Sequence, residues 1–206
     1  MGLLSSTVSL TRYKVEGNLK QPVLDTIADG LKKYVIRDID DDVPDRAVGW
    51  TSFENSFHPD FEGSSFSIGE LLVFSLRIDK KSIPAKVIQK HFKIASAKRL
   101  ADSGREYLSQ NEKKMLKEEV INRLNLRIPS TPNIYDLMWD YENAVVWFFS
   151  TQKAANEELE TLFSKSFGVT IPFSLREANP DVLCCIMADK ETTGSFSLRA
   201  NITFSW

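Results

Sequence analysis

Lysine and arginine are concentrated in one part of this 206-residue chain. The stretch Arg77 to Arg127 holds 14 of the 26 basic residues but only six of the 28 acidic ones, a local excess of eight positive charges. The rest of the chain holds 12 basic and 22 acidic residues, so the net charge of −2 conceals the split. A strongly basic segment on an otherwise acidic protein usually faces a negative partner, and nucleic acid is the commonest one.

Three lysines of this stretch share one side of an expected helix. At 100° per residue, Lys86, Lys90 and Lys93 fall within about 60° of one another. Binding to phosphates needs many cations at loose spacing and little else, whereas a merely solvated helix surface would normally mix lysine with glutamate. The residues that we expect to contact nucleic acid are Lys80, Lys81, Lys86, Lys90, Lys93, Lys98, Arg99, Arg105, Lys113, Lys114 and Lys117.

The sequence contains no motif for reading bases. Zinc-finger spacing, an RNA-recognition motif and a Gly-x-x-Gly clamp are all missing from it. A Gly-rich phosphate loop, a Cys-x-x-Cys pair and a nucleophile elbow are missing too, so we expect no cofactor and no catalytic residue. The pattern therefore favours contact with the phosphate backbone, independent of base sequence.

An acidic loop gives the main alternative. Its carboxylates could hold a divalent metal ion of the kind that nucleases require, but the loop lacks the EF-hand spacing and its turn glycine. No partner carboxylates stand out elsewhere, so a solvated loop is the favoured interpretation and a metal site is not expected. The loop residues are Asp38, Asp40, Asp41, Asp42 and Asp45.

The two histidines give no sign of catalysis. His58 lies in a polar loop near Asp60, and His91 lies among lysines. Neither histidine has a nucleophile or a metal ligand at a spacing typical of a catalytic or metal-binding motif, so we assign no catalytic role to either.

Tryptophans and cysteines are expected to be structural. Trp50, Trp139 and Trp147 are expected in the core, although an exposed tryptophan could stack on a base. Cys184 and Cys185 are adjacent in an apolar run and are expected to be reduced and buried in a strand, which fits a cytoplasmic protein. No secretory signal and no apolar run of membrane-spanning length is visible.

The basic stretch is expected to form two helices. Pro84 begins a helix that continues to about Ala101, and residues 102–104 break it. Ser109 with Glu112 three residues later forms a capping box for a second helix, which extends to about Arg127. The apolar stripe of this second helix is Leu116, Val120, Leu124 and Ile128.

The segments on either side alternate between strand and helix patterns. Strands are expected at residues 4–15, 47–53, 66–78, 134–141 and 144–150, with two more near the end, the last being the alternating Ser195–Trp206. Helices are expected after Pro22 and from a Thr151 cap to Phe167, where Gly168 ends the helix. The expected fold class is α+β, an antiparallel sheet with packed helices and an inserted basic helical hairpin. Residues 1–78 and 129–206 would form the central domain, and 79–128 the basic arm.

Several segments resemble, in order, the bacterial family of recombination-associated protein RdgC. They are KKSIPAKVIQK (80–90), GREYLSQNEKKMLKEEV (104–120), the Met138-Trp139 strand and STQKAANEELETLFSKSFG (150–168), together with Gly49-Trp50 and ANP (178–180). The match covers roughly residues 1–180. Within the basic stretch the residues that fit the family pattern are Lys81, Pro84, Arg105, Lys113 and Lys117, whereas Lys86 and Lys90 depart from it but add charge of the same sign.

The resemblance implies a nonspecific binder of double-stranded DNA. Members of the family form a ring-shaped homodimer whose positive inner surface surrounds duplex DNA, and they limit the access of the recombinase RecA to DNA. This implies a cytoplasmic, nucleoid-associated protein that modulates recombination. Because family members continue beyond the last residue here, a closed ring, an open clamp and a different dimer all stay open.

Two other classes of function are alternatives to DNA binding. Some descriptions of the family call it an exonuclease, which would require the acidic loop to hold metal. Alternatively, the basic arm could meet an acidic protein instead of DNA.

Overall fold

The computed structural model describes residues 3, 5, 8–63 and 65–172, and these divide into two compact units. The sheet unit comprises the described residues within 3–36, 49–77 and 134–172. The helical unit comprises residues 37–48 and 78–133. Three strands contain a boundary between the units, because their residue ranges span positions 48–49, 77–78 and 133–134.

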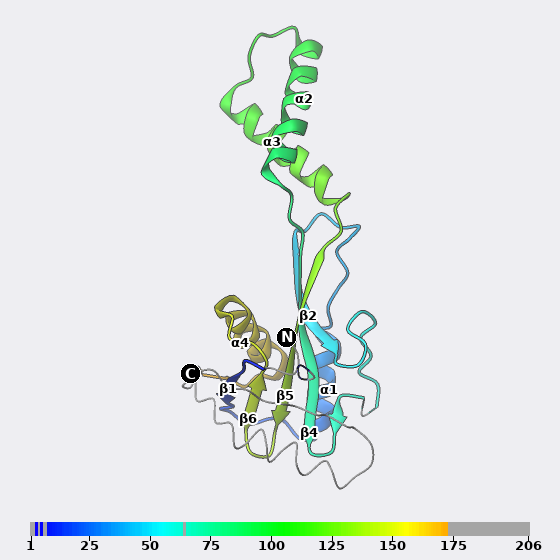
Figure 1. The fold of residues 1–206 in the computed structure, drawn as a ribbon, viewed down its shortest axis with the longest axis vertical. Helices are drawn as coiled ribbons and strands as arrows, with labels where there is room; N and C mark the ends of the chain where they lie inside the picture. The colour runs from blue at the N-terminus through cyan, green and yellow to red at the C-terminus, as the bar shows by residue number, and fades with distance from the viewer. Residues whose placement is uncertain (1–2, 4, 6–7, 64, 173–206) are drawn as a thin grey trace. The chain divides into compact units, whose positions relative to one another are not determined.

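Within the part of the chain that the structure describes, the strands form one six-stranded sheet with the order β1-β6-β5-β4-β2 and with β3 paired to β4. Adjacent pairs are antiparallel, with Thr11 and Leu137 both opposite Phe148. Together with the four helices of the described residues, this sheet confirms the α+β class (Figure 1). The strands are β1 (Thr11–Lys14), β2 (Arg46–Ser52), β3 (Ser67–Ile68), β4 (Leu71–Lys80), β5 (Thr131–Asp140) and β6 (Val145–Phe148).

The strand expected at residues 66–78 is two strands. β3 and β4 form a hairpin in which Ser67 lies opposite Leu72 and Ile68 opposite Leu71. The chain reverses at Gly69, whose φ of +63° is favourable for glycine and costly for other residues. From Leu72 to Asp79 every residue of β4 is buried, as a central strand requires.

Two helices, α1 (Val23–Lys33) and α4 (Lys153–Phe167), contact each other in the sheet unit. The Phe163 ring on α4 lies 4.7 Å from that of Trp139 and 4.8 Å from that of Phe167, and Trp50 stacks on Phe167 at 5.9 Å. Trp50, Trp139 and Phe163 are completely buried, so the expected aromatic core is confirmed. Trp147 belongs to a second buried cluster with Val73, Met138, Val145 and Phe149.

The ends of α4 were partly predicted. Gly168 follows it with φ +69°, so the predicted glycine stop is confirmed. Thr151 is not the cap, because the helix begins one residue later: Gln152 is the N-cap residue, without a side-chain cap.

The first strand is shorter than expected, since β1 begins at Thr11. The two strands predicted near the end lie outside the described residues.

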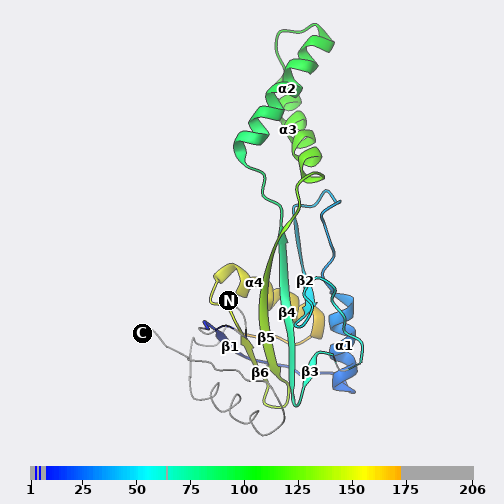
Figure 2. The ribbon, with the colours of Figure 1, turned by 45° about the vertical axis from the view of Figure 1, so that its right-hand side comes forward.

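The helical unit contains α2 (Ala85–Ser103) and α3 (Gln110–Asn125), which lie side by side (Figures 1 and 2). Both were predicted, and Gly104 ends α2 in the left-handed conformation. In the part of the chain that the structure describes, no helix has the length and apolar character needed to span a bilayer.

Candidate nucleic-acid interface on the helical unit

The helix α2 is exposed to solvent over much of its surface. None of its 19 residues is buried. Its half-buried side includes Ile88, Phe92 and Ala95, whereas Lys86 and Lys90 are exposed. Five of its residues are basic and one is acidic. The sequence therefore makes α2 a helix that packs weakly on one side and carries cations elsewhere.

The helix α3 packs through the expected apolar stripe. Leu116, Val120 and Leu124 are buried, one helical turn apart, and Ile128 is half-buried after the helix ends. This spacing places the three side chains on one face. Lys113, Lys114 and Lys117 lie in the exposed part of the same helix.

The start of α3 is fixed by the predicted capping box. The Glu112 N–H donates to Ser109 Oγ at 3.3 Å, and the Ser109 N–H donates to Glu112 Oε2 at 2.8 Å. Hydrogen bonding of the Glu112 carboxyl to the backbone N–H and the side chain of Ser109, and then the charge of Arg105, lower the pKa of Glu112. The box satisfies two N–H groups that a helix start would otherwise leave open.

Most of the predicted lysines are exposed. No described residue forms an ion pair with the ammonium groups of Lys80, Lys86, Lys90, Lys93, Lys98, Lys113, Lys114 and Lys117. The helices α2 and α3 together carry seven of these eight lysines. Such cations can exchange their counterions for phosphates.

The two predicted arginines are exposed but paired. Arg99 Nη2 lies 3.9 Å from Glu119 Oε2, and Arg105 Nη1 donates to Glu112 Oε1 at 3.2 Å. Exposed pairs of this kind contribute about 0–1 kcal/mol. Both guanidinium groups can therefore change partner at small cost.

Lys81 needs a correction, because the structure buries it. Its side chain is 4% exposed, and its ammonium donates to the carbonyls of Asp40 at 3.0 Å, Asp42 at 2.7 Å and Asn125 at 2.6 Å. These bonds use all three donors of the ammonium group. Lys81 therefore joins the loop at 38–45 to the end of α3 and is not available to a phosphate.

The acidic loop is a structural part of the helical unit. Asp40 Oδ1 accepts from both the N–H and the hydroxyl of Ser130, at 2.7 and 2.6 Å. Asn125, which is buried, donates to the Val43 carbonyl at 3.1 Å. Among the described residues no group of three or more His, Cys, Asp or Glu is placed to hold a metal ion.

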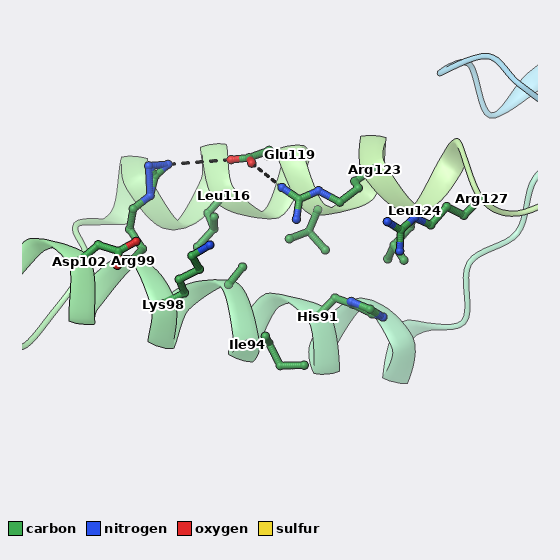
Figure 3. Close-up of a pocket in the computed structure, with 12 residues that line it drawn as sticks. His91, Ile94, Lys98, Arg99, Asp102, Leu116, Glu119, Arg123, Leu124 and Arg127 are labelled. Carbon is green, nitrogen blue, oxygen red and sulfur yellow. Dashed lines mark hydrogen bonds and ion pairs between the residues drawn. The ribbon is translucent and has the colours of Figure 1, made fainter.

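A groove lies between α2 and α3 and has a volume of about 350 Å³. Figure 3 shows His91, Lys98 and Arg99 of α2 along it, facing Glu119 and Arg123 of α3. Arg123 and Arg127 line this groove but were not among the predicted contacts, because sequence alone does not show which flank of α3 faces α2. His58, by contrast, lies exposed in a turn region of the sheet unit.

Comparison with known proteins identifies the family. The family model described as "Putative exonuclease, RdgC" matches residues 9–205, which is most of the chain. The chain therefore belongs to the RdgC family, as the ordered segments predicted. A search of curated proteins finds no significant match.

Proposed function

We propose that this protein binds double-stranded DNA without base specificity, through the lysines of α2 and α3. The observation that carries the proposal is the presence of seven exposed lysines on these helices, none in an ion pair with a described residue. Ordinary exposed helices mix their charges and pair them, whereas α2 has five basic residues against one acidic residue.

The proposed mechanism is electrostatic. Each lysine that neutralises a phosphate releases a condensed counterion, so the affinity depends on cation number more than on geometry. Phosphates are the same in every sequence, and a protein bound to them alone can slide along the duplex. Bound protein would exclude a recombinase filament such as that of RecA from the DNA it covers.

Salt dependence is the direct test of this function. With about six phosphate contacts, the affinity for a random duplex should fall on the order of a thousand-fold between 50 and 200 mM salt. Fluorescence anisotropy with two unrelated duplexes of equal length should give the same affinities. A shallow salt dependence, or a tenfold preference for one sequence, would contradict phosphate-based binding.

The proposal includes a homodimer. Large apolar side chains on the helical unit are exposed, with Ile94 58%, Tyr107 79% and Met115 69% accessible, and a second copy could cover them. A DNA-binding protein of this kind would lie with the nucleoid in the cytoplasm. Sedimentation with and without duplex would establish whether two copies assemble and whether DNA is needed.

Exonuclease activity is the second candidate, because the family description uses that word. Hydrolysis would need carboxylates arranged around a metal ion. Duplex labelled at its ends, incubated with Mg²⁺ or Mn²⁺, would decide this. Release of label that is lost in Asp42→Asn supports a nuclease. Asp40→Asn is harder to interpret, because Asp40 also accepts two hydrogen bonds from Ser130 and the substitution would disturb the loop.

Binding to an acidic protein partner is the third candidate. The same exposed lysines would serve it. Absence of any shift of random duplex at low salt, together with binding of a poly-glutamate peptide, would favour this function over DNA binding.

A further inference from the structure

One carboxylate sits among the cations of the groove between α2 and α3. Glu119 Oε1 accepts from Arg123 Nη2 at 2.8 Å, and its Oε2 lies 3.9 Å from Arg99 Nη2 (Figure 3). The two arginines come from different helices, so one carboxylate links α2 to α3. Lys98 and Arg127 line the same groove.

The groove has an apolar floor with an excess of cations above it. Leu116, Val120 and Leu124 form the floor and are buried. Above them, four lysine or arginine side chains face only two carboxylates, those of Asp102 and Glu119. A groove with surplus cations is complementary to a ligand with more negative charge than one glutamate can supply.

The geometry around Glu119 suits a phosphate equally well. A guanidinium group binds carboxylates and phosphates through the same planar set of donors. The side chains of Arg99, Glu119 and Arg123 are 56%, 52% and 59% exposed. Pairs this open to water are weak and exchange readily with solvent ions.

We propose that this groove is a phosphodiester subsite in which Glu119 is a resident competitor, displaced when a DNA phosphate binds Arg99 and Arg123. This inference rests on the proposed DNA binding. It adds a specific location for one phosphate and a side chain, Glu119, that weakens binding by competing for the arginines. DNA is favoured over an acidic peptide because the free lysines on the same two helices would contact neighbouring phosphates.

The test compares two neighbouring glutamates of α3. Glu119→Gln removes the resident carboxylate, whereas Glu118→Gln makes the same charge change at an exposed residue with no ion pair to any described residue. About 100° to 160° of helix face separates Glu118 from the groove-lining residues of α3, because each residue turns the helix by about 100°. Glu119→Gln should bind a random duplex about threefold to tenfold more tightly at 50 mM salt and steepen the logarithmic salt slope by about one to two. Glu118→Gln should stay within about twofold of the unmodified protein.

A second set of variants tests whether the arginines carry the effect. Arg99→Gln with Arg123→Gln should weaken binding, and adding Glu119→Gln to that double variant should then change nothing. All variants alter exposed side chains, and circular dichroism will show whether α2 and α3 keep their helicity.

The outcomes separate this inference from the function on which it rests. Equal gains in Glu119→Gln and Glu118→Gln would overturn the subsite while leaving DNA binding through the lysines intact. An unchanged duplex affinity with tighter binding of a poly-glutamate peptide would overturn it in favour of a protein ligand. If the unmodified protein does not bind duplex DNA at all, the proposed function itself is overturned.

Discussion

The two units of this protein differ in what holds their residues in place. In the sheet unit, rings from a strand and a helix pack together, and Trp139 and Phe163 are completely buried. In the helical unit, α2 buries no residue and α3 buries a single apolar stripe and one asparagine. The sheet unit thus has a wide aromatic core, whereas the core of the helical unit is thin.

The difference follows from how much of α2 is exposed. A helix that leaves most of its residues exposed to solvent cannot also bury a wide apolar face. The helical unit compensates with Lys81, whose three hydrogen bonds join two of its segments, and with the capping box of α3. The hydrogen bonds of Lys81 and the capping box can each be removed by one substitution.

The largest effect is expected in the aromatic core. Phe163→Ala should lower the free energy of unfolding by about 3–5 kcal/mol, because it removes a buried ring and leaves a cavity. Trp50, Trp139 and Trp147 all belong to the sheet unit, so tryptophan fluorescence during urea titration reports on it. A loss below about 1 kcal/mol would show that the aromatic cluster does not stabilise this unit.

A smaller effect is expected at the buried lysine. Lys81→Met should cost about 2–3 kcal/mol, since three carbonyls lose a charged donor. Hydrogen exchange should quicken at residues 38–45 and near Asn125. Lys80→Met is the matched control, because Lys80 is the adjacent exposed lysine.

The outcome at Lys81 also tests the correction made above. If Lys81→Met weakened DNA binding without changing exchange or stability, the lysine would be a phosphate contact after all.

The smallest effect is expected at the cap of α3. Ser109→Ala should cost about 1 kcal/mol of helix stability, because the Glu112 N–H loses its acceptor. Since the pKa of Glu112 is lowered in the folded protein, its contribution is present above the ordinary glutamate pKa and is lost as pH falls through the lowered one. Helicity followed by circular dichroism should show a weaker acid transition in Ser109→Ala.

The helices of the candidate site could be predicted because their signals are local. Pro84, the capping box and the stripe on α3 each depend on residues within a few turns. The role of Lys81 could not be predicted, since its acceptors lie 39 to 44 residues away in the chain. A lysine next to other lysines gives no sequence signal that distinguishes a buried ammonium from an exposed one.

The same contrast applies to the sheet and the groove. The apolar run of β4 predicted a strand, but the hairpin with β3 was missed because Gly69 was not interpreted as a turn. Arg123 was missed as a groove residue, since its position depends on how α2 and α3 pack.

The most direct test of DNA binding through α2 and α3 makes the same change of charge in each of the two units. Lys113→Glu with Lys117→Glu changes the helical unit, and Lys14→Glu with Lys20→Glu makes an equal change at exposed lysines of the sheet unit. We predict that the first pair weakens binding to every duplex by at least about tenfold at 50 mM salt and flattens the logarithmic salt slope by about two, while the second pair has little effect. Equal losses from both pairs would contradict the claim that α2 and α3 form the DNA-binding surface.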